Sequence, residues 1–300
     1  MKFYIVDAFA DQLFGGNTAG VVILKNKEDF PCEEVMIKTA AELKYSETAF
    51  VKRIGKKQFN IRYFTPAAEV DLCGHATIGA FGALLDKGFI KNNDVCMVST
   101  LAGNIEVLVQ DGFVFMDMST PIEIAAISEH KNIEELAGIM GIAAEKIIME
   151  PKLVSTGLPD IMLAVDSKET LMEINPDFKA LAELSKKYEV VGVHAFALAA
   201  EEDITAYCRN FAPLYDIDEE AATGTSNGAL TYYLYKSGLI KENEKNVFLQ
   251  GESMNRPSKI MSMLTKTENS INIKVGGVYK ILAKGSILLE DSCSSGLNCE

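Results

Sequence analysis

The chain has no tryptophan, only 3 histidines in 300 residues, and no apolar run near the roughly 20 residues of a membrane-spanning helix. Its 6 cysteines form no Cys-x-x-Cys pair and no regular framework. This argues against a disulfide-stapled fold and favours reduced thiols. The N-terminal run is short and alternating and breaks at Asp7, so we expect no signal peptide and a cytoplasmic protein.

Positive charge is also scarce. The 29 lysines and arginines are outnumbered by 42 aspartates and glutamates, which gives a net charge of −13. This balance argues against nucleic acids and membranes as partners. If the partner is a small carboxylate, an acidic protein has to bind it with local dipoles. The chain is 48% hydrophobic, enough for two cores without a structural metal.

The most informative feature present is an internal repeat. The motif FTPAAEVDLCGHAT opens one copy and FAPLYDIDEEAATGTS opens the other, and an apolar run follows each. Gly74 aligns with Gly224, and Gly88 aligns with Gly238 at the same offset. A duplication of this kind predicts two similar halves.

We therefore predict an N-terminal domain over residues 1–120 and a C-terminal domain over 121–290, with an active cleft between them. Residues 291–300 are small and polar and are predicted to be a frayed tail.

The predicted elements indicate an α+β fold. Strands occur in runs and do not alternate one-for-one with helices, which argues against a doubly wound sheet. The segments 76–85 and 228–234 are apolar nearly all round, as in a helix at the centre of a core. We expect two pseudo-symmetric domains, each a mostly antiparallel, barrel-like sheet around a central helix. Gly276-Gly277 predicts a hairpin turn.

Each repeat also places a glycine turn at the start of a helix. Such a start has free backbone N–H groups and the positive end of the helix dipole. Two starts that face each other, at Gly74 and Gly224, would hold a carboxylate.

Glu47 is the first candidate for chemistry. It lies between Ser46 and Thr48 at the edge of an apolar strand. Burial there would raise its pKa toward the range useful for proton transfer at neutral pH. Taken alone, Glu47 is better explained as an exposed glutamate at a strand end.

Cys73, Gly74 and His75 form the second candidate group. In the first turn of a helix, the dipole should keep His75 neutral and lower the pKa of the Cys73 thiol. The plainer alternative is a small buried cysteine and a histidine that caps the helix. No second ligand cluster lies nearby in the sequence, so we predict no metal.

The third group surrounds the second glycine turn. Thr225 and Ser226 could cap the helix or bind an anion, and Glu220 lies just outside the turn. An acidic residue near a helix start is also stabilised by the dipole alone. Asn17 follows a routine Gly-Gly turn and could touch the ligand. Arg256 could anchor a carboxylate, although a surface arginine is the simpler interpretation.

Taken together, the chain resembles the PhzF-like (phenazine biosynthesis) isomerase family, within the diaminopimelate epimerase-like fold. The matches keep their order over nearly the whole chain. They are FGGNTAGVVIL, SETAFV, FTPAAEVDLCGHATIGA, STGLPDIML, FAP followed by EEAATGTSNGAL, and MNRPSKI.

The resemblance implies two pseudo-symmetric domains, catalysis at their interface, no cofactor and no metal. It assigns the acid/base role to Glu47, with His75 and an acidic residue nearby. It places Gly74, Gly224 and Thr225 at the carboxylate clamp. A homodimer is implied by the same analogy. The family usually has Asp-Pro-Ala-Thr-Gly where this chain has EAATG, which leaves the role of Glu220 and the substrate open.

Three functions follow from this reading. The first is a cofactor-independent isomerase that moves a proton on a small, possibly cyclic, amino or hydroxy carboxylic acid. The second is a dehydratase- or racemase-type enzyme that uses Cys73 and Thr223. A two-thiol racemase is disfavoured, because threonine is a poor acid and a poor base. The third is a non-catalytic carboxylate-binding protein.

Overall fold

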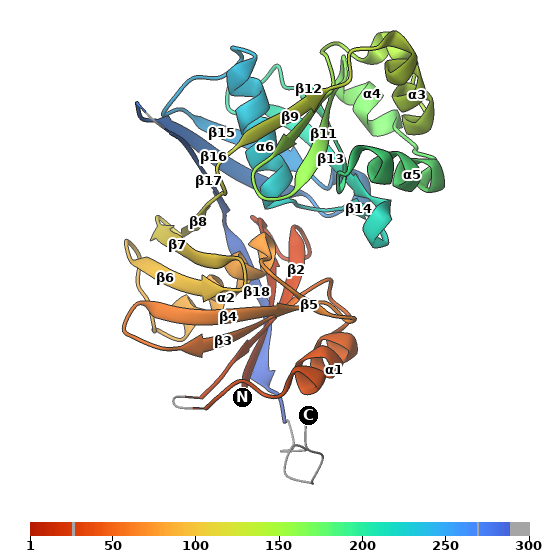
Figure 1. Cartoon of the computed structure of the whole chain (residues 1–300). Helices are drawn as coiled ribbons and strands as arrows, with labels where there is room; N and C mark the ends of the chain where they lie inside the picture. Colours follow the sequence, from red (N-terminus) through yellow and green to blue (C-terminus); the bar gives the residue numbers. More distant parts are fainter. Residues whose placement is uncertain (26–27, 269, 289–300) are drawn as a thin grey trace. The chain divides into compact units, whose positions relative to one another are not determined.

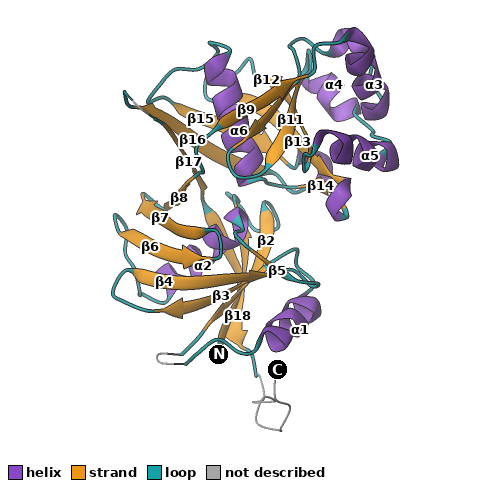
Figure 2. Cartoon of the chain, in the orientation of Figure 1, coloured by secondary structure: helices purple, strands orange, loops and turns teal. Residues whose placement is uncertain are grey.

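The computed structural model describes residues 1–25, 28–268 and 270–288 (Figure 1). Strands make up most of the ordered elements and helices are few, in a mixed α/β arrangement (Figure 2). Among the described helices, none combines the length and the apolar character that crossing a bilayer requires. The predicted tail, 291–300, lies outside the described residues.

Contacts along the chain divide it into two compact units. Unit 1 contains Met1–Ala8, Thr18–Val114 and the segment from Tyr279 onward. Unit 2 contains Phe9–Asn17 and Phe115–Val278. This differs from the single boundary near residue 120 that we predicted. The last described strand belongs to unit 1 because it pairs with the first strand along its whole length.

The described part of unit 1 consists of short strands and the two helices α1 and α2. They are β1 (Lys2–Ala8), β2 (Asn17–Ile23, whose first residue is assigned to unit 2), α1 (Glu33–Leu43), β3 (Thr48–Arg53), β4 (Gln58–Phe64), β5 (Glu69–Val70), α2 (Gly74–Asp86), β6 (Val95–Thr100), β7 (Gly103–Gln110), the start of β8 (Phe113–Asp117) and β18 (Tyr279–Ser286).

Unit 2 holds the remaining elements and most of the helices. They are β9 (Ile122–Ala126), α3 (His130–Met140), η1 (Ala144–Lys146), β10 (Lys152–Ser155), β11 (Pro159–Ala164), α4 (Lys168–Glu173), α5 (Phe178–Tyr188), β12 (Gly192–Leu198), β13 (Ala206–Ala212), η2 (Pro213–Tyr215), β14 (Ile217–Glu220), α6 (Gly224–Lys236), β15 (Lys245–Gln250), η3 (Glu252–Met254), β16 (Ser258–Lys266) and β17 (Ile271–Gly277).

The strand pairings of unit 1 recur in unit 2. In unit 1, β2 pairs parallel with β3, and β3 pairs antiparallel with β4. In unit 2, β11, β12 and β13 repeat this order. In unit 1, β4 then pairs parallel with β6, and β6 pairs antiparallel with β7. In unit 2, β13 pairs parallel with β15, and β15 pairs antiparallel with β16. The duplication in the sequence therefore extends to the backbone pairing.

The two glycine-initiated helices, α2 and α6, have 13 residues each. In α2, all residues from His75 to Leu84 are buried, and the helix contacts β1, β3 and β18. In α6, most of the residues are buried, and the helix contacts β10, β11, β16 and β17. Gly88 and Gly238 follow the helix ends with left-handed φ values of 68° and 74°. This backbone conformation explains the aligned glycines, because a glycine in the left-handed region commonly ends a helix.

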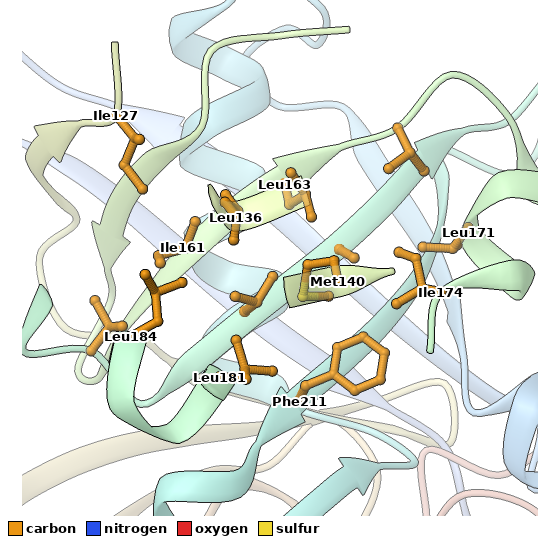
Figure 3. Packing of buried hydrophobic residues seen from close by; sticks show 14 of the residues in the cluster. Ile127, Leu136, Met140, Ile161, Leu163, Leu171, Ile174, Leu181, Leu184 and Phe211 are labelled. Carbon is orange, nitrogen blue, oxygen red and sulfur yellow. The ribbon is translucent and has the colours of Figure 1, made fainter. Parts of the chain in front are cut away.

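Figure 3 shows the apolar core on the helical side of unit 2. Helices α3, α4 and α5 contribute Leu136, Met140, Leu171 and Leu181, which pack against strand residues such as Leu163. In unit 1, a smaller cluster fixes α1 against the strands. Its buried members are Val22, Leu24, Met36, Ala40, Phe50 and Phe64.

The hairpin predicted at Gly276-Gly277 is wrong. Both glycines lie inside β17, where Gly276 pairs with Met261. A Cβ atom at Gly277 would lie 2.6 Å from the ring of Phe9, so this glycine allows a close approach within the sheet and makes no turn.

A matched pair of glycine substitutions tests the packing of α2. A Cβ atom at buried Gly82 would lie 2.5 Å from the ring of Tyr279 on β18, whereas one at exposed Gly138 in α3 would meet nothing within 4 Å. We expect Gly82→Ala to lower the free energy of unfolding by about 1–3 kcal/mol. Gly138→Ala should raise it by about 0.5–1 kcal/mol. Urea denaturation measures both, and equal effects would contradict this packing.

Candidate active site

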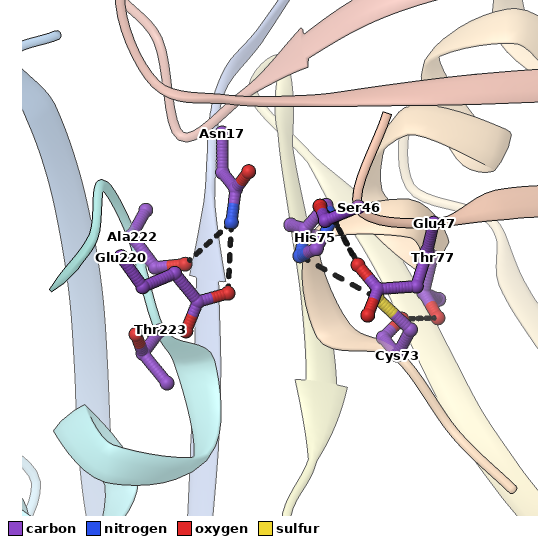
Figure 4. A network of polar contacts seen from close by, with 9 residues as sticks. All are labelled: Asn17, Ser46, Glu47, Cys73, His75, Thr77, Glu220, Ala222 and Thr223. Atoms are coloured by element: carbon purple, nitrogen blue, oxygen red, sulfur yellow. Dashed lines mark hydrogen bonds and ion pairs between the residues drawn. The ribbon is translucent and has the colours of Figure 1, made fainter. Parts of the chain in front are cut away.

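In unit 1, the predicted residues Ser46, Glu47, Cys73 and His75 form one group (Figure 4). Glu47 directly precedes β3, and its backbone carbonyl accepts a hydrogen bond from Gly20 on β2. Cys73 is the N-cap residue of α2, and His75 lies in the first turn of that helix. The repeated strand and the helix start therefore bring these side chains together.

An ion pair between Glu47 and His75 is the centre of this group. Oε2 of Glu47 lies 3.1 Å from Nε2 of His75, and the two side chains are 17% and 5% exposed. Oγ of Ser46 lies 3.3 Å from the same ring nitrogen. Oε2 is buried but accepts no hydrogen bond of regular geometry. The ion pair therefore holds the carboxylate of Glu47 in a largely buried position.

The electrostatics of this pair differ from what we predicted. Burial opposes both charges, but the mutual attraction outweighs it. The pKa of Glu47 is lowered by His75, and the pKa of His75 is raised well above its usual value of 6.5 with help from Cys73 and Glu47. The predictions of a raised glutamate pKa and a neutral histidine are therefore wrong. The pKa of His75 is raised by its contacts with Cys73 and Glu47, which the helix-dipole argument left out.

The prediction for Cys73 is also wrong. Burial and the nearby Glu47 raise the pKa of its thiol to about 11, so it is not a thiolate at neutral pH. Glu47, Cys73 and His75 are close enough together to be considered as metal ligands. At neutral pH, however, the raised pKa values keep both the Cys73 thiol and the His75 ring protonated, whereas a metal binds the thiolate and the neutral imidazole. This donor set does not fit a metal well.

In unit 2, Asn17, Glu220 and Thr223 form the second group (Figure 4). Asn17 donates from Nδ2 to Oε1 of Glu220 at 2.9 Å and to the carbonyl of Ala222 at 3.1 Å. Thr223 donates its hydroxyl to Oε2 of Glu220 at 2.5 Å. Thr223 is the N-cap of α6, but its side chain makes no capping bond. Both carboxylate oxygens of Glu220 are therefore bonded by side chains of this unit.

Arg256 stabilises the turn that precedes Asn17. Its guanidinium donates to the carbonyls of Gly15 and Gly16, each at 2.8 Å. These bonds hold the turn that carries Asn17. The structure thus gives Arg256 a partner in the backbone, whereas the sequence indicated either a carboxylate anchor or a surface arginine.

The remaining predicted residues occupy the start of α6. Gly224 is buried at the helix start, and Thr225 accepts a hydrogen bond on its carbonyl from Thr156 at 2.8 Å. Ser226 donates to the carboxylate of Asp160 at 2.6 Å. Asp160 is 1% exposed, and burial raises its pKa to about 6.

The sequence analysis missed Asp160 and Gln250. Asp160 stands in the motif STGLPDIML and Gln250 at the end of a strand, and neither position carries a local signal of function. The predicted residues fall into two groups, one in each unit. The cleft expected between the halves stays a prediction.

A family model of a phenazine biosynthesis-like protein, PhzC-PhzF, matches residues 6–285. The chain belongs to this family. It is 30% identical to an uncharacterized isomerase of Clostridium acetobutylicum, over 96% of this chain and 98% of that protein. A PhzF-family phenazine biosynthesis protein of Enterococcus faecalis superimposes with a TM-score of 0.75 and 28% identity, over 96% of this chain and 99% of that one.

More distant structures share the fold alone. A PhzF-family protein of Bacillus anthracis has a TM-score of 0.83 at 23% identity, over 96% and 99% of the two chains. A hydroxyproline epimerase of Agrobacterium vitis has a TM-score of 0.61 at 14% identity, over 97% and 92%. Several curated relatives are named isomerases, and this PhzF-like chain is an isomerase as well.

Proposed function

We propose that this PhzF-like isomerase moves a proton between two carbons of a small carboxylic acid, with Glu47 as the acid/base group and no cofactor. The ion pair between Glu47 and His75 is the observation that carries the proposal. It supplies an ionised carboxylate in a largely buried position, next to a protonated imidazole.

The proposed reaction balances without a further reagent. Glu47 takes a proton from a carbon near the substrate carboxylate, and the electron pair left behind delocalises toward that acid group. The neutral Glu47 then returns the proton to another carbon. Backbone N–H groups at a helix start, such as Gly74 in α2, stabilise the negative charge that develops in between. His75 keeps the base ionised before each turnover.

We assign the second group to binding and orienting the substrate. Glu220 has both oxygens engaged by Asn17 and Thr223, which supports a positioned acid at the start of α6. In this proposal, Glu220 fills the place of the aspartate that the family usually carries. We further propose that each unit is a barrel-like sheet around its glycine-initiated helix, as the repeated pairings and the buried helices suggest.

The alternative based on Cys73 and Thr223 has less support. The raised pKa of Cys73 makes its thiol a poor base at neutral pH. The hydroxyl of Thr223 is engaged by Glu220. A binding protein without activity has less support as well, because relatives across the whole chain are named isomerases.

Incubation with candidate acids in deuterated water tests the function. Cyclic and unsaturated amino and hydroxy carboxylic acids are added singly to the protein, and deuterium incorporation at carbon is followed by NMR. We expect at least one acid to exchange a carbon-bound proton for deuterium and to form an isomer, whose molecular formula is otherwise unchanged. Tight binding of an acid without exchange, across the whole series, would support the non-catalytic alternative instead.

A further inference from the structure

A network of buried side chains is hydrogen-bonded to the second group. Gln250, at the end of β15, is completely buried. Its Nε2 donates to the backbone carbonyl of Glu220 at 2.7 Å and to the hydroxyl oxygen of Thr223 at 3.2 Å. Its Oε1 accepts from Nδ2 of Asn227 at 2.8 Å. Since Gln250 donates to the Thr223 oxygen, the proton of that hydroxyl is directed to Glu220.

The network continues inward to a buried histidine. His194 is 0% exposed, and burial lowers its pKa to about 4, so it is neutral at neutral pH. Its Nδ1 lies 3.0 Å from Oδ1 of the Asn210 side-chain amide. Asn210 is in turn the strand partner of Glu220 in the pairing of β13 with β14. The network thus begins and ends beside Glu220.

Two buried atoms of this network identify the tautomer of His194. Nε2 of His194 and Oδ1 of Asn227 have no hydrogen-bond partner of regular geometry. The two side chains nevertheless interact, because Asn227 acts on the pKa of His194 through a side-chain hydrogen bond. A proton on Nε2 gives Oδ1 the donor it lacks. The amide of Asn210 then presents its NH₂ group to Nδ1, which a half-turn of that amide achieves.

Unit 1 has a different arrangement at the matching positions. Tyr63 precedes Phe64 as Asn210 precedes Phe211, and Thr77 follows Gly74 by three residues as Asn227 follows Gly224. Tyr63 and Thr77 share a hydrogen bond of 2.7 Å, and Thr77 donates to the carbonyl of Cys73. That short pair ends at the backbone. In unit 2, the network instead reaches the side chains of the second group.

We propose that Gln250 is a positioning residue for the Glu220–Thr223 pair, and that Asn210, His194 and Asn227 orient it through a continuous chain of hydrogen bonds. In this chain, His194 carries its proton on Nε2. The inference rests on the proposed function only in that it assigns the Glu220–Thr223 pair to the site. Its test needs no substrate, so its failure can be told from a failure of that function.

The first test is ¹⁵N NMR of the histidine rings in the full chain at neutral pH, with His194 assigned by its loss in His194→Gln. We expect the two ring nitrogens of His194 to show the neutral form with the proton on Nε2. A proton on Nδ1 would overturn the continuous chain.

The second test compares Gln250→Met with Thr231→Val. Gln250→Met keeps the length of the side chain and removes its hydrogen bonds. Thr231→Val removes a hydrogen bond of 2.6 Å to Ser262, equally buried but farther along α6. With a ¹³C label on the glutamate carboxyls, we expect the titration midpoint of Glu220 to rise in Gln250→Met and to stay in place in Thr231→Val.

The shift is expected because the Thr223 hydroxyl loses its orientation and donates less well to Glu220. Asp160 interacts electrostatically with Glu220 and is unchanged in both variants. An unchanged midpoint in Gln250→Met, or an equal shift in both variants, would refute the positioning role. If Gln250→Met does not fold, the tautomer of His194 in the unmodified chain still tests the chain of hydrogen bonds that is proposed to orient Gln250.

Discussion

Replacing Glu47 with glutamine should lower the rate of solvent proton exchange by a factor on the order of 10²–10⁴. Glutamine has nearly the same shape but cannot take or return a proton. The rate is measured as deuterium incorporation into an acid that the unmodified protein accepts. Because Glu47 is largely buried beside His75, no bulk water can easily replace it as the base.

The matched control for this change is Glu42→Gln. Glu42 is exposed on α1 and undergoes the same chemical change outside the group. We expect its exchange rate to equal that of the unmodified protein. A Glu47→Gln variant that is folded and exchanges at the unmodified rate would refute Glu47 as the acid/base group. In that case the isomerase would have to use another base.

Local patterns in the sequence predicted both glycine-initiated helices of the repeat. Helices α2 and α6 begin at Gly74 and Gly224 and include the apolar segments 76–85 and 228–234, as predicted. Apolar periodicity and the Gly88 cap are local signals, so they can be read along the chain. Helix α3 was not predicted, although its Leu136 and Met140 fill the core of unit 2. The placement of β18 in unit 1 depends on pairing with residues more than 270 positions away, and no local pattern reports this.

In the site as well, the sequence identified the residues but did not give their charge states. The sequence pointed to Glu47, His75, Glu220 and Thr223, and the structure places them in two compact groups. The predicted charge states were wrong because they considered each residue with only its own burial or helix dipole. The contact of 3.1 Å between Glu47 and His75 joins residues 28 positions apart, and together with Cys73 it reverses both predicted shifts.

Replacing His75 with asparagine should therefore raise the pKa of Glu47. In the unmodified protein, burial raises this pKa, but His75, with smaller contributions from Ser46 and Cys73, holds it below 4.5. Without the cation, only the hydrogen bonds from Ser46 and Cys73 still oppose burial, so the pKa should rise. The base then becomes protonated at a higher pH, so the acid limb of the exchange rate moves in the same direction. Titration of the ¹³C-labelled carboxyl of Glu47, assigned by its loss in Glu47→Gln, measures the shift without a substrate.

The same pair should also leave a signature in stability. The contribution of Glu47 is present above pH 4.5 and is lost as the pH falls through its lowered folded-state pKa. The contribution of His75 is present below pH 6.5 and is lost as the pH rises through its raised folded-state pKa. The difference in unfolding free energy between the unmodified protein and His75→Asn should therefore be largest between pH 4.5 and 6.5.

Exposed His130 provides the control for both measurements. It lies 3.4 Å from Glu134 with 85% of its side chain exposed, so solvent screens this pair. His130→Asn should leave the titration of Glu47 and the pH dependence of stability unchanged. If His75→Asn instead leaves the midpoint of Glu47 at or below its unmodified value, the ion pair does not set the charge of the base. The buried carboxylate would then need another source of stabilisation, and the proposed role of His75 would be wrong.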